Sequence, residues 1–300
     1  MNIQSVKVII LASMFFGYAG SVAAIPPSQK AKEKTAENQR FIVGIEVAIA
    51  NFATDEQKKE YEVIKDEYLA GLSLFLETNY VDSYKTQLAA QKKLEKLFEQ
   101  LSLDYIERTS TMLQRVIKNF VELRVKFDNK SELVRRYGVD IDPADDRSYD
   151  PTEYHLTYDR HTIFRNIQMG YERLSDARRI RKGGIDLEKW FEEGKEPDPR
   201  YHAMRIERYL AAINICRKSK LNVVKIYQLL NRNDIYTVQT EERDNRFAVE
   251  SNLPPVLDPR IPDEFKKDAS DAKNLVHDIE KAKTGKKANN TNNGGAGGGG

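Results

Sequence analysis

Cysteine is nearly absent from this chain of 300 residues, which contains only Cys216. A lone thiol cannot form an internal disulfide, so the sequence excludes the small disulfide-rich scaffolds that many secreted proteins use. Stability must instead come from a packed core. Cys216 lies on the apolar stripe of a helix that we predict over about 200–231, and we therefore expect its thiol to be buried and unreactive.

Proline and glycine are scarce in the first half of the chain. No proline occurs between Pro27 and Pro143, and the only glycines there are Gly44, Gly71 and Gly138. Proline breaks helices, and glycine weakens them because its backbone loses more entropy on folding. Their scarcity over this long stretch predicts a mostly helical structure.

The apolar residues of this half repeat at steps of three and four, as on one face of a helix. They predict helices over about 30–52, 55–79 and 83–128, of which the last would be about 65–70 Å long. The second helix follows "TDEQ", where Thr54 and Gln57 can form a capping box. The positions expected to face the core are Phe41, Ile45, Ala48, Phe52, Tyr61, Ile64, Tyr68, Leu72, Phe75, Leu94, Phe98, Leu101, Tyr105, Met112, Val116, Leu123 and Phe127.

The second half is also predicted to be helical, with more interruptions. We expect one helix to stop at Gly183 and Gly184, a short helix to surround Trp190, and a long helix to run over about 200–231. Apolar stripes mark the faces of the two longer helices. Their members are Ile163, Ile167, Gly170, Leu174 and Ala177, and then Ile206, Tyr209, Ile213, Cys216, Val223, Tyr227 and Leu230.

The sequence changes character after Asn233. The stretch "IYTVQT" predicts a short strand or an extended arm, and "LPPVLDPRIP" predicts a proline-rich strap. Pro262 with the acidic residues behind it favours a helix start, so we predict a C-terminal helix over about 262–283. The tail, 284–300, is rich in glycine and asparagine, and we expect it to be disordered because it cannot bury a core.

Long hydrophobic runs are missing, apart from one near the N-terminus. There Lys7 precedes an apolar run and small residues lead to Ala24, which is typical of a secretory signal peptide over 1–24, cleaved after Ala24 or one residue earlier. The alternative is a membrane anchor, but the run is too short to span a bilayer comfortably. We therefore expect a periplasmic protein with no membrane association after cleavage.

Neither sign of charge dominates, because 48 lysines and arginines face 46 aspartates and glutamates. Nucleic-acid-binding proteins usually carry a large basic excess, so nucleic acid is not an expected partner. A charged fraction of 31% with abundant lysine, glutamate and leucine is typical of long helices.

The stretch "GVDIDPADDRSYDP" interrupts the helical pattern and is rich in aspartate. Its carboxylates are Asp140, Asp142, Asp145, Asp146 and Asp150. Calcium prefers such oxygen ligands, but the stretch lacks the glycine and the distal glutamate of an EF-hand loop. The alternative that we favour is a solvated joint over 138–152, stiffened by Pro143 and Pro151, with no metal bound.

No arrangement of residues predicts catalysis. The histidines are His155, His161, His202 and His277, and none has the i, i+4 spacing of a helical metal site. Asp159 near His161 is weak support for acid–base chemistry. The sequence also lacks a phosphate-binding glycine loop, a nucleophile elbow and a zinc-protease motif. We therefore expect a protein that is not an enzyme, without catalytic residues or cofactors.

One basic run is a candidate partner-binding site. It comprises Arg178, Arg179, Arg181 and Lys182. Cations are favourable near the C-terminus of a helix, which accounts for the run without any partner. The alternative is docking to an acidic protein surface.

Two stretches of the second half carry a family resemblance, "YDRHTIFRNIQMGYERLSDARRIRKGG" and "YLAAINICRKSKLNVVKIYQLL". Together with the proline-free first half and the acidic joint, the chain over about 30–260 resembles the flagellar coiling proteins of spirochaetes, which sheath the periplasmic flagella. The resemblance implies an all-α, elongated and V-shaped molecule of two coiled-coil-like bundles, over 25–137 and 153–283. The joint at 138–152 would form the apex.

The resemblance also implies a structural function without catalytic residues. The chain would assemble laterally on the flagellin core with other sheath proteins, and would promote filament coiling, curvature and cell motility. Two alternatives stay open on the residues alone. One is a periplasmic helical adaptor or chaperone that binds other proteins, and the other is an enzyme with an unrecognised site.

Overall fold

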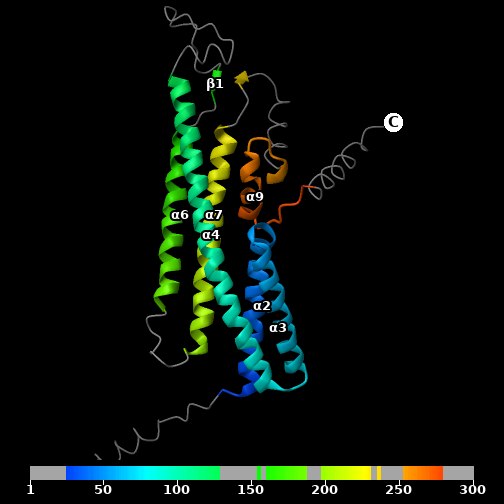
Figure 1. Cartoon of the computed structure of the whole chain (residues 1–300). Coiled ribbons are helices and arrows are strands. Elements are labelled where there is room, and N and C mark those ends of the chain that lie inside the picture. Colours follow the sequence, from blue (N-terminus) through cyan, green and yellow to red (C-terminus); the bar gives the residue numbers. More distant parts are fainter. Residues whose placement is uncertain are drawn as a thin grey trace, which may run out of the picture.

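The computed structural model describes residues 25–128, 154–156, 160–187, 197–230, 235–237 and 253–279. They form an elongated bundle of helices, which confirms the all-α class (Figure 1). The helices are α2 (Pro27–Phe52), α3 (Asp55–Leu76), α4 (Tyr80–Asp128), α6 (Arg160–Asp186), α7 (Pro199–Leu230), the 3-10 helix η2 (Pro255–Leu257) and α9 (Asp263–Ala272). The predicted signal peptide, the joint at 138–152, the helix around Trp190 and the tail at 284–300 lie outside the described residues.

A short strand pair supplements the helices. The strand β1 (Tyr154–Leu156) pairs antiparallel with β2 (Ile235–Thr237), and His155 is opposite Tyr236 in the register. The extended conformation predicted for "IYTVQT" is therefore confirmed over β2. The strap "LPPVLDPRIP" contains η2 and a turn before α9.

Local sequence fixes both ends of α3. The capping box is present, since Gln57 N donates to Thr54 Oγ1 at 3.2 Å and Thr54 N donates to Gln57 Oε1 at 2.9 Å. At the other end, Asn79 N donates to the carbonyl of Leu74 at 2.9 Å, and Thr78 adopts a φ of 63°. This Schellman-type ending closes α3 at Leu76, a few residues before the predicted end.

The helix α4 is the longest of the described helices and contacts helices on two of its sides. Its 49 residues span about 70 Å, close to the predicted length. It packs against α2 and α3 on one side and against α6 and α7 on the other, as Figure 1 shows. The two helix groups expected from the sequence thus share α4, and a single core runs through both of them.

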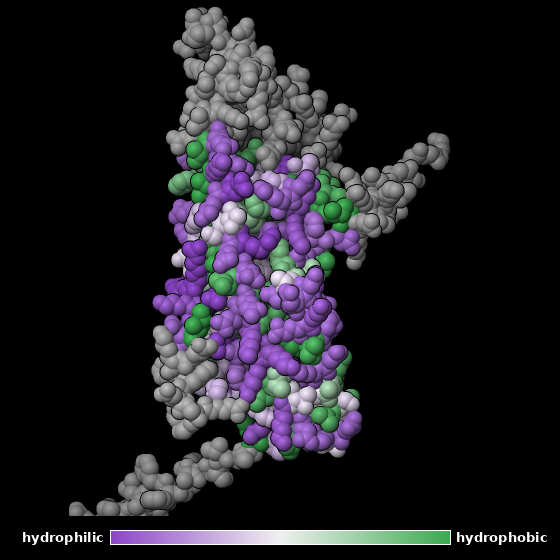
Figure 2. Space-filling view, in the orientation of Figure 1, coloured by the Kyte–Doolittle hydropathy of each residue, from purple (hydrophilic) through white to green (hydrophobic). Residues whose placement is uncertain are grey.

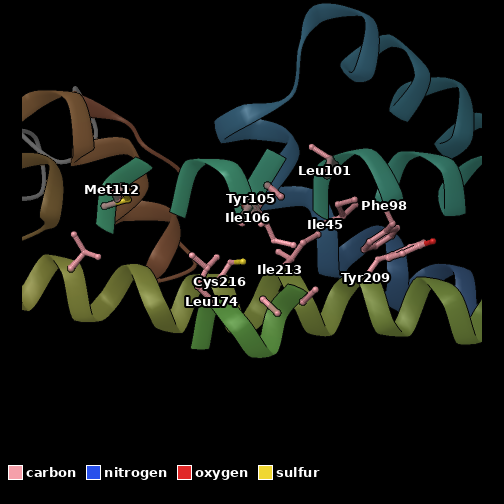
Figure 3. Packing of buried hydrophobic residues seen from close by; sticks show 14 of the residues in the cluster. Ile45, Phe98, Leu101, Tyr105, Ile106, Met112, Leu174, Tyr209, Ile213 and Cys216 are labelled. Carbon is pink, nitrogen blue, oxygen red and sulfur yellow. The ribbon is translucent and has the colours of Figure 1, made fainter. Parts of the chain in front are cut away.

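The core contains most of the residues whose spacing predicted burial. Ile45, Phe98, Tyr105 and Ile213 come from three helices and meet in its centre (Figure 3). The predicted α3 positions Tyr68, Leu72 and Phe75 are only partly buried, because α3 covers one edge of the bundle. The side chains of Leu123 and Phe127 lie outside the described part.

The prediction that a helix stops at Gly183 and Gly184 is wrong, since α6 continues to Asp186. These glycines instead allow α7 to approach closely. A Cβ on Gly184 would lie 2.8 Å from Tyr209 Cε1, and one on Gly183 would lie 2.3 Å from Arg208 Nη1. Glycine thus serves helix packing here, and not chain reversal.

The predicted C-terminal helix is too long, because α9 ends at Ala272 and not near 283. Asn274 adopts a φ of 58°. Leu275 N donates to Ser270 O at 2.9 Å, and Asn274 N donates to Asp271 O at 2.7 Å. This is a Schellman ending with asparagine in the left-handed position, which the residue tolerates better than most.

Candidate functional site

The predicted basic run divides between two faces of α6. Arg178 Nη2 lies 3.5 Å from Ser110 Oγ, and Arg181 Nε donates to Ser102 Oγ at 3.1 Å, so both reach across to α4. Arg179 pairs with Asp176 on α6 at 2.8 Å, and Lys182 is exposed. Arg178, Arg179 and Lys182 are exposed and Arg181 is partly buried, so the role of this run in binding a partner stays a prediction.

The three histidines whose side chains are described, His161, His202 and His277, have different surroundings. His202 is buried and contacts Glu95, which also pairs with Arg205. His161 is exposed, while the backbone N–H of His277 donates to Asn51 Oδ1 at 2.9 Å. Within the described residues, no three His, Cys, Asp or Glu side chains cluster as a metal site would require. The acidic stretch at 138–152, Asp159 and the side chain of His155 are outside that part.

Cys216 faces the core, as its position on the stripe predicts, and it is fully buried. Burial raises the pKa of its thiol to about 11. A thiol with so high a pKa forms little of the reactive thiolate at neutral pH, so the geometry favours a packing role.

A polar interior site lies where α9 docks, and it centres on Asp271. Tyr105 Oη donates to Asp271 Oδ1 at 2.6 Å, and Arg217 Nη2 donates to the same oxygen at 3.2 Å. Lys220 Nζ lies 3.4 Å from Asp271 Oδ2. Asp271 and Lys220 are both fully buried. This carboxylate of α9 is thus held by side chains of α4 and α7.

Asp268 makes a second set of contacts one turn earlier on α9. Its Oδ1 lies 2.8 Å from Lys220 Nζ, and Arg108 of α4 forms a two-pronged pair with it, at 2.7 Å from Nη2 and 3.2 Å from Nε. We call Asp268 and Asp271 the acid pair. Arg108, Arg217 and Lys220 form what we call the cationic slot.

Aromatic rings enclose the cationic slot. Lys220 Nζ lies 4.4 Å from the ring centroid of Phe52 and 4.3 Å from that of Tyr105. The guanidinium carbon of Arg108 lies 4.2 Å from the Phe52 centroid. The two rings meet edge to face at 5.4 Å. The negative faces of these rings stabilise the buried Lys220 and the partly exposed Arg108, and α2 thereby joins the site through Phe52.

The electrostatics of the site favour the ionised form of Asp268. Burial by itself would raise the pKa of Asp268, but the nearby Lys220 and Arg108 outweigh burial and lower it. Burial and the neighbouring Asp271 carboxylate raise the pKa of Tyr105, so its phenol stays protonated and donates. The acid pair and the cationic slot together form a network of ion pairs between α4, α7 and α9, which we call the ion-pair lock.

The surface carries a separate feature at the end of the bundle where α3 turns into α4. Leu69, Leu76 and Val81 are 54%, 74% and 53% exposed. Leu69 and Leu76 lie two turns apart on one face of α3, and Val81 follows the turn. Figure 2 shows hydrophobic residues gathered at this end. We call these three residues the apolar tip.

An open groove lies beside α9. It has a volume of about 480 Å³ and is lined mainly by apolar residues of three segments. These include Val47 of α2, Val256 of η2, and Leu275 and Val276, which follow α9. Figure 2 shows a second hydrophobic area in this region.

Sequence reasoning missed the ion-pair lock. Asp268 and Asp271 are spaced to share one helix face, as are Arg217 and Lys220. That spacing is equally typical of solvated surface charges, and nothing in it links α9 to α7. The apolar tip could be found more easily from the sequence, because Leu76 and Val81 are apolar residues on either side of a predicted helix boundary.

None of the described helices combines the length and the apolar character that crossing a bilayer requires. A family model described as surface protein adhesin OmpL37, a family of spirochaetes, matches residues 28–130. The match therefore covers α2, α3 and α4, and with them the apolar tip. No curated protein and no solved structure matches the chain. The similarity to a surface-protein family agrees with an extracytoplasmic location, as the N-terminal sequence predicts.

Proposed function

We propose that this chain is an extracytoplasmic structural protein that acts by binding other protein chains through the surface of its bundle. The observation that carries the proposal is the apolar tip, where Leu69, Leu76 and Val81 are at least half exposed. Covering apolar surface on association contributes about 25 cal/mol per Å². The tip lies within the residues that resemble an adhesin family, and binding is the property that this description names.

The more specific form of the proposal is a subunit of the periplasmic flagellar filament sheath. It rests on the resemblance to the flagellar coiling proteins, with flagellin and other sheath proteins as partners. A stiff unit built on α4, which is about 70 Å long, suits such a role mechanically. Stiff units bound along one side of a filament make that side longer and so bend it, which would promote coiling and motility.

A second candidate function is adhesion at the cell surface, which the match over residues 28–130 favours. The same apolar tip would then contact a molecule outside the cell. An envelope adaptor or chaperone would use this surface too, with changing partners. The three functions differ in where the protein is found and in what it binds.

Cell fractionation of the wild-type protein and of a double variant distinguishes between these functions. We expect the wild-type protein to copurify with intact filaments, and the double variant Leu76→Glu, Val81→Glu to be lost from them. The control is Val121→Glu, which places one such charge on an exposed apolar position of α4 far from the tip. Recovery of the wild-type protein on the outer surface alone would favour adhesion. Retention of the tip variant on filaments would contradict a contact through the apolar tip.

A further inference from the structure

The helices α3 and α6 each expose a stripe of side chains at intervals of seven residues. The members are Glu62, Leu69 and Leu76 on α3, and Phe164, Tyr171 and Arg178 on α6. All of them are exposed, and the exposed fractions of Leu76 and Phe164 reach 74% and 62%. Residues at this interval lie two turns apart on the same face of a helix. We call the two sets the α3 stripe and the α6 stripe.

The two stripes are complementary in charge. The α3 stripe begins with a glutamate and continues with two leucines, whereas the α6 stripe begins with two aromatic residues and ends with an arginine. Neighbouring exposed residues extend the pattern, since Asp66 lies one turn after Glu62 and Arg179 follows Arg178. The complete helices show the same contrast, with six acidic and three basic residues in α3, and seven basic and three acidic residues in α6. Opposite charges on two surfaces favour and orient their association.

The two stripes do not meet within one chain. The helix α3 packs against α2 and α4, whereas α6 packs against α7 and α4. Figure 1 shows α3 and α6 on opposite sides of the bundle, with α4 between them. A contact between the stripes therefore requires two chains, and a second copy of this chain is the partner that offers both the matching charge and the matching spacing.

We propose that the α3 stripe of one copy binds the α6 stripe of a second copy, with the two helices antiparallel. The paired residues are then Leu76 with Phe164, Leu69 with Tyr171, and Glu62 with Arg178. Because the intervals are equal in both stripes, all of these pairs form in one register, as in the seam of a coiled coil. The apolar pairs cover surface that faces water in the single chain.

The direction of the helices follows from the order of the residues in the stripes. A parallel arrangement would place Glu62 against Phe164 and Leu76 against Arg178, so charged side chains would lose water without gaining a partner. The antiparallel arrangement brings the apolar ends together and the charged ends together. An exposed ion pair contributes little energy, so the pair of Glu62 with Arg178 determines the register, and the apolar pairs supply most of the affinity.

This contact uses different surfaces on the two copies. A copy whose α3 stripe is occupied still offers its α6 stripe, so the contact repeats from copy to copy and builds chains or rings. One helix from each copy takes part, which is little compared with stable complexes that bury about 1,600 Å². We therefore expect association at high protein concentration, as when copies lie side by side on a filament. The inference rests on the proposed function, since Leu69 and Leu76 belong to the apolar tip, and it identifies a second copy as the partner of that tip.

Crosslinking between single-cysteine copies of the full-length protein tests the register. Copies with Leu76→Cys are mixed with copies with Phe164→Cys at high concentration, a short bismaleimide reagent is added, and denaturing electrophoresis measures the dimers. The native Cys216 is fully buried in both. We expect this mixture, and the mixture of Glu62→Cys with Arg178→Cys, to give at least about tenfold more dimer than two mismatched controls. The controls are Leu76→Cys with Arg178→Cys, and Glu62→Cys with Phe164→Cys.

A charge exchange between the stripes provides a second measurement. Sedimentation velocity records self-association of the full-length protein, and Arg178→Glu should weaken it at least about tenfold, because two carboxylates then face each other. The double variant Glu62→Arg, Arg178→Glu restores opposite charges and should associate within about threefold of the wild-type protein. This recovery distinguishes a lost contact from a folding defect. The control Lys218→Glu reverses an exposed charge on α7 outside both stripes and should associate like the wild-type protein.

Equal crosslinking in the matched and mismatched mixtures, or crosslinking in none of them, would overturn the inference. A double variant that associates as weakly as Arg178→Glu would overturn it as well. Either result leaves the proposed function standing if the tip variant Leu76→Glu, Val81→Glu is still lost from filaments, since the tip would then bind a different protein. Matched crosslinking by a protein that does not copurify with filaments would support the inference and contradict only the filament-sheath form of the proposed function.

Discussion

Lys220 of α7 and Asp268 of α9 form a buried ion pair, with 2.8 Å between Nζ and Oδ1 and relative exposures of 0% and 1%. The lysine also reaches Asp271 and lies against the rings of Phe52 and Tyr105. One ammonium group thus connects four helices. A buried pair of this kind contributes little net stability over an apolar pair, but removing Asp268 leaves the buried Lys220 with only its longer contact to Asp271, at 3.4 Å.

The first prediction concerns this pair. Asp268→Ala should lower the free energy of unfolding by about 3 kcal/mol, because the buried Lys220 loses its shorter ion pair and keeps only the 3.4 Å contact to Asp271, whereas Arg108 is partly exposed to solvent. Lys65→Ala removes an exposed i, i+3 pair with Glu62 and should cost less than about 0.5 kcal/mol. Urea denaturation followed by circular dichroism measures both. Equal losses in the two variants would show that the lock does not stabilise the fold.

The second prediction concerns acid. Burial would raise the pKa of Asp268 and of Asp258, but Lys220 and Arg108 in one case and Arg260 in the other lower both below the ordinary value. As the pH falls, these carboxylates therefore become protonated at a higher pH in the unfolded chain than in the folded protein. The stability that the carboxylates provide is present above the unfolded pKa, and is lost as pH falls below about 4.

In the variant Asp268→Asn, the free energy of unfolding should accordingly decrease less steeply as the pH falls into the acid range, although the variant is less stable at neutral pH. Urea midpoints between about pH 5 and pH 3 measure the slope. An acid limb of unchanged steepness in Asp268→Asn would mean that other carboxylates determine the acid sensitivity.

The third prediction compares two helical glycines. Gly184→Ala should destabilise the protein by about 1–3 kcal/mol, because the new methyl group would lie 2.8 Å from Tyr209 Cε1. Gly44→Ala is the control, since its Cβ would lie 3.4 Å from Leu210 Cδ2. There the gain in helix propensity, up to about 1 kcal/mol, should dominate. Thermal unfolding distinguishes the two, and a stabilised Gly184→Ala would contradict the close approach of α6 and α7.

The fourth prediction concerns Cys216. Its thiol is fully buried, and burial raises its pKa to about 11. The native protein should therefore react with a thiol reagent such as DTNB only as fast as it unfolds, and reaction should be complete in denaturant. Rapid labelling at neutral pH without denaturant would contradict the burial of α7 against its neighbours.

The sequence predicts the helices well and their mutual placement poorly, for a physical reason. Periodicity reports which face of a helix is apolar, so positions such as Phe41, Phe98 and Tyr209 are correctly placed in the core. It does not report which helix covers that face. The sharing of α4 by both helix groups and the docking of α9 were therefore not predictable in this way.

The errors at helix ends have the same origin. In the sequence, Gly184 is typical of a helix end, yet α7 packs against this glycine and α6 continues past it. Asn274 ends α9 through a left-handed backbone conformation that a single asparagine signals only weakly. The ion-pair lock escaped prediction because charges at helical spacing are far more often solvated than buried.

Site-specific photocrosslinking in living cells tests the central claim, binding of other protein chains through the apolar tip, most directly. A photoreactive amino acid at Leu76 is compared with the same group at Val121, which is also exposed on the bundle. We expect the Leu76 derivative to form one dominant adduct, with mass spectrometry identifying flagellin or a sheath protein in it, and the Val121 derivative to lack that adduct. Absence of any protein adduct at Leu76, or the same adducts at both positions, would contradict the account.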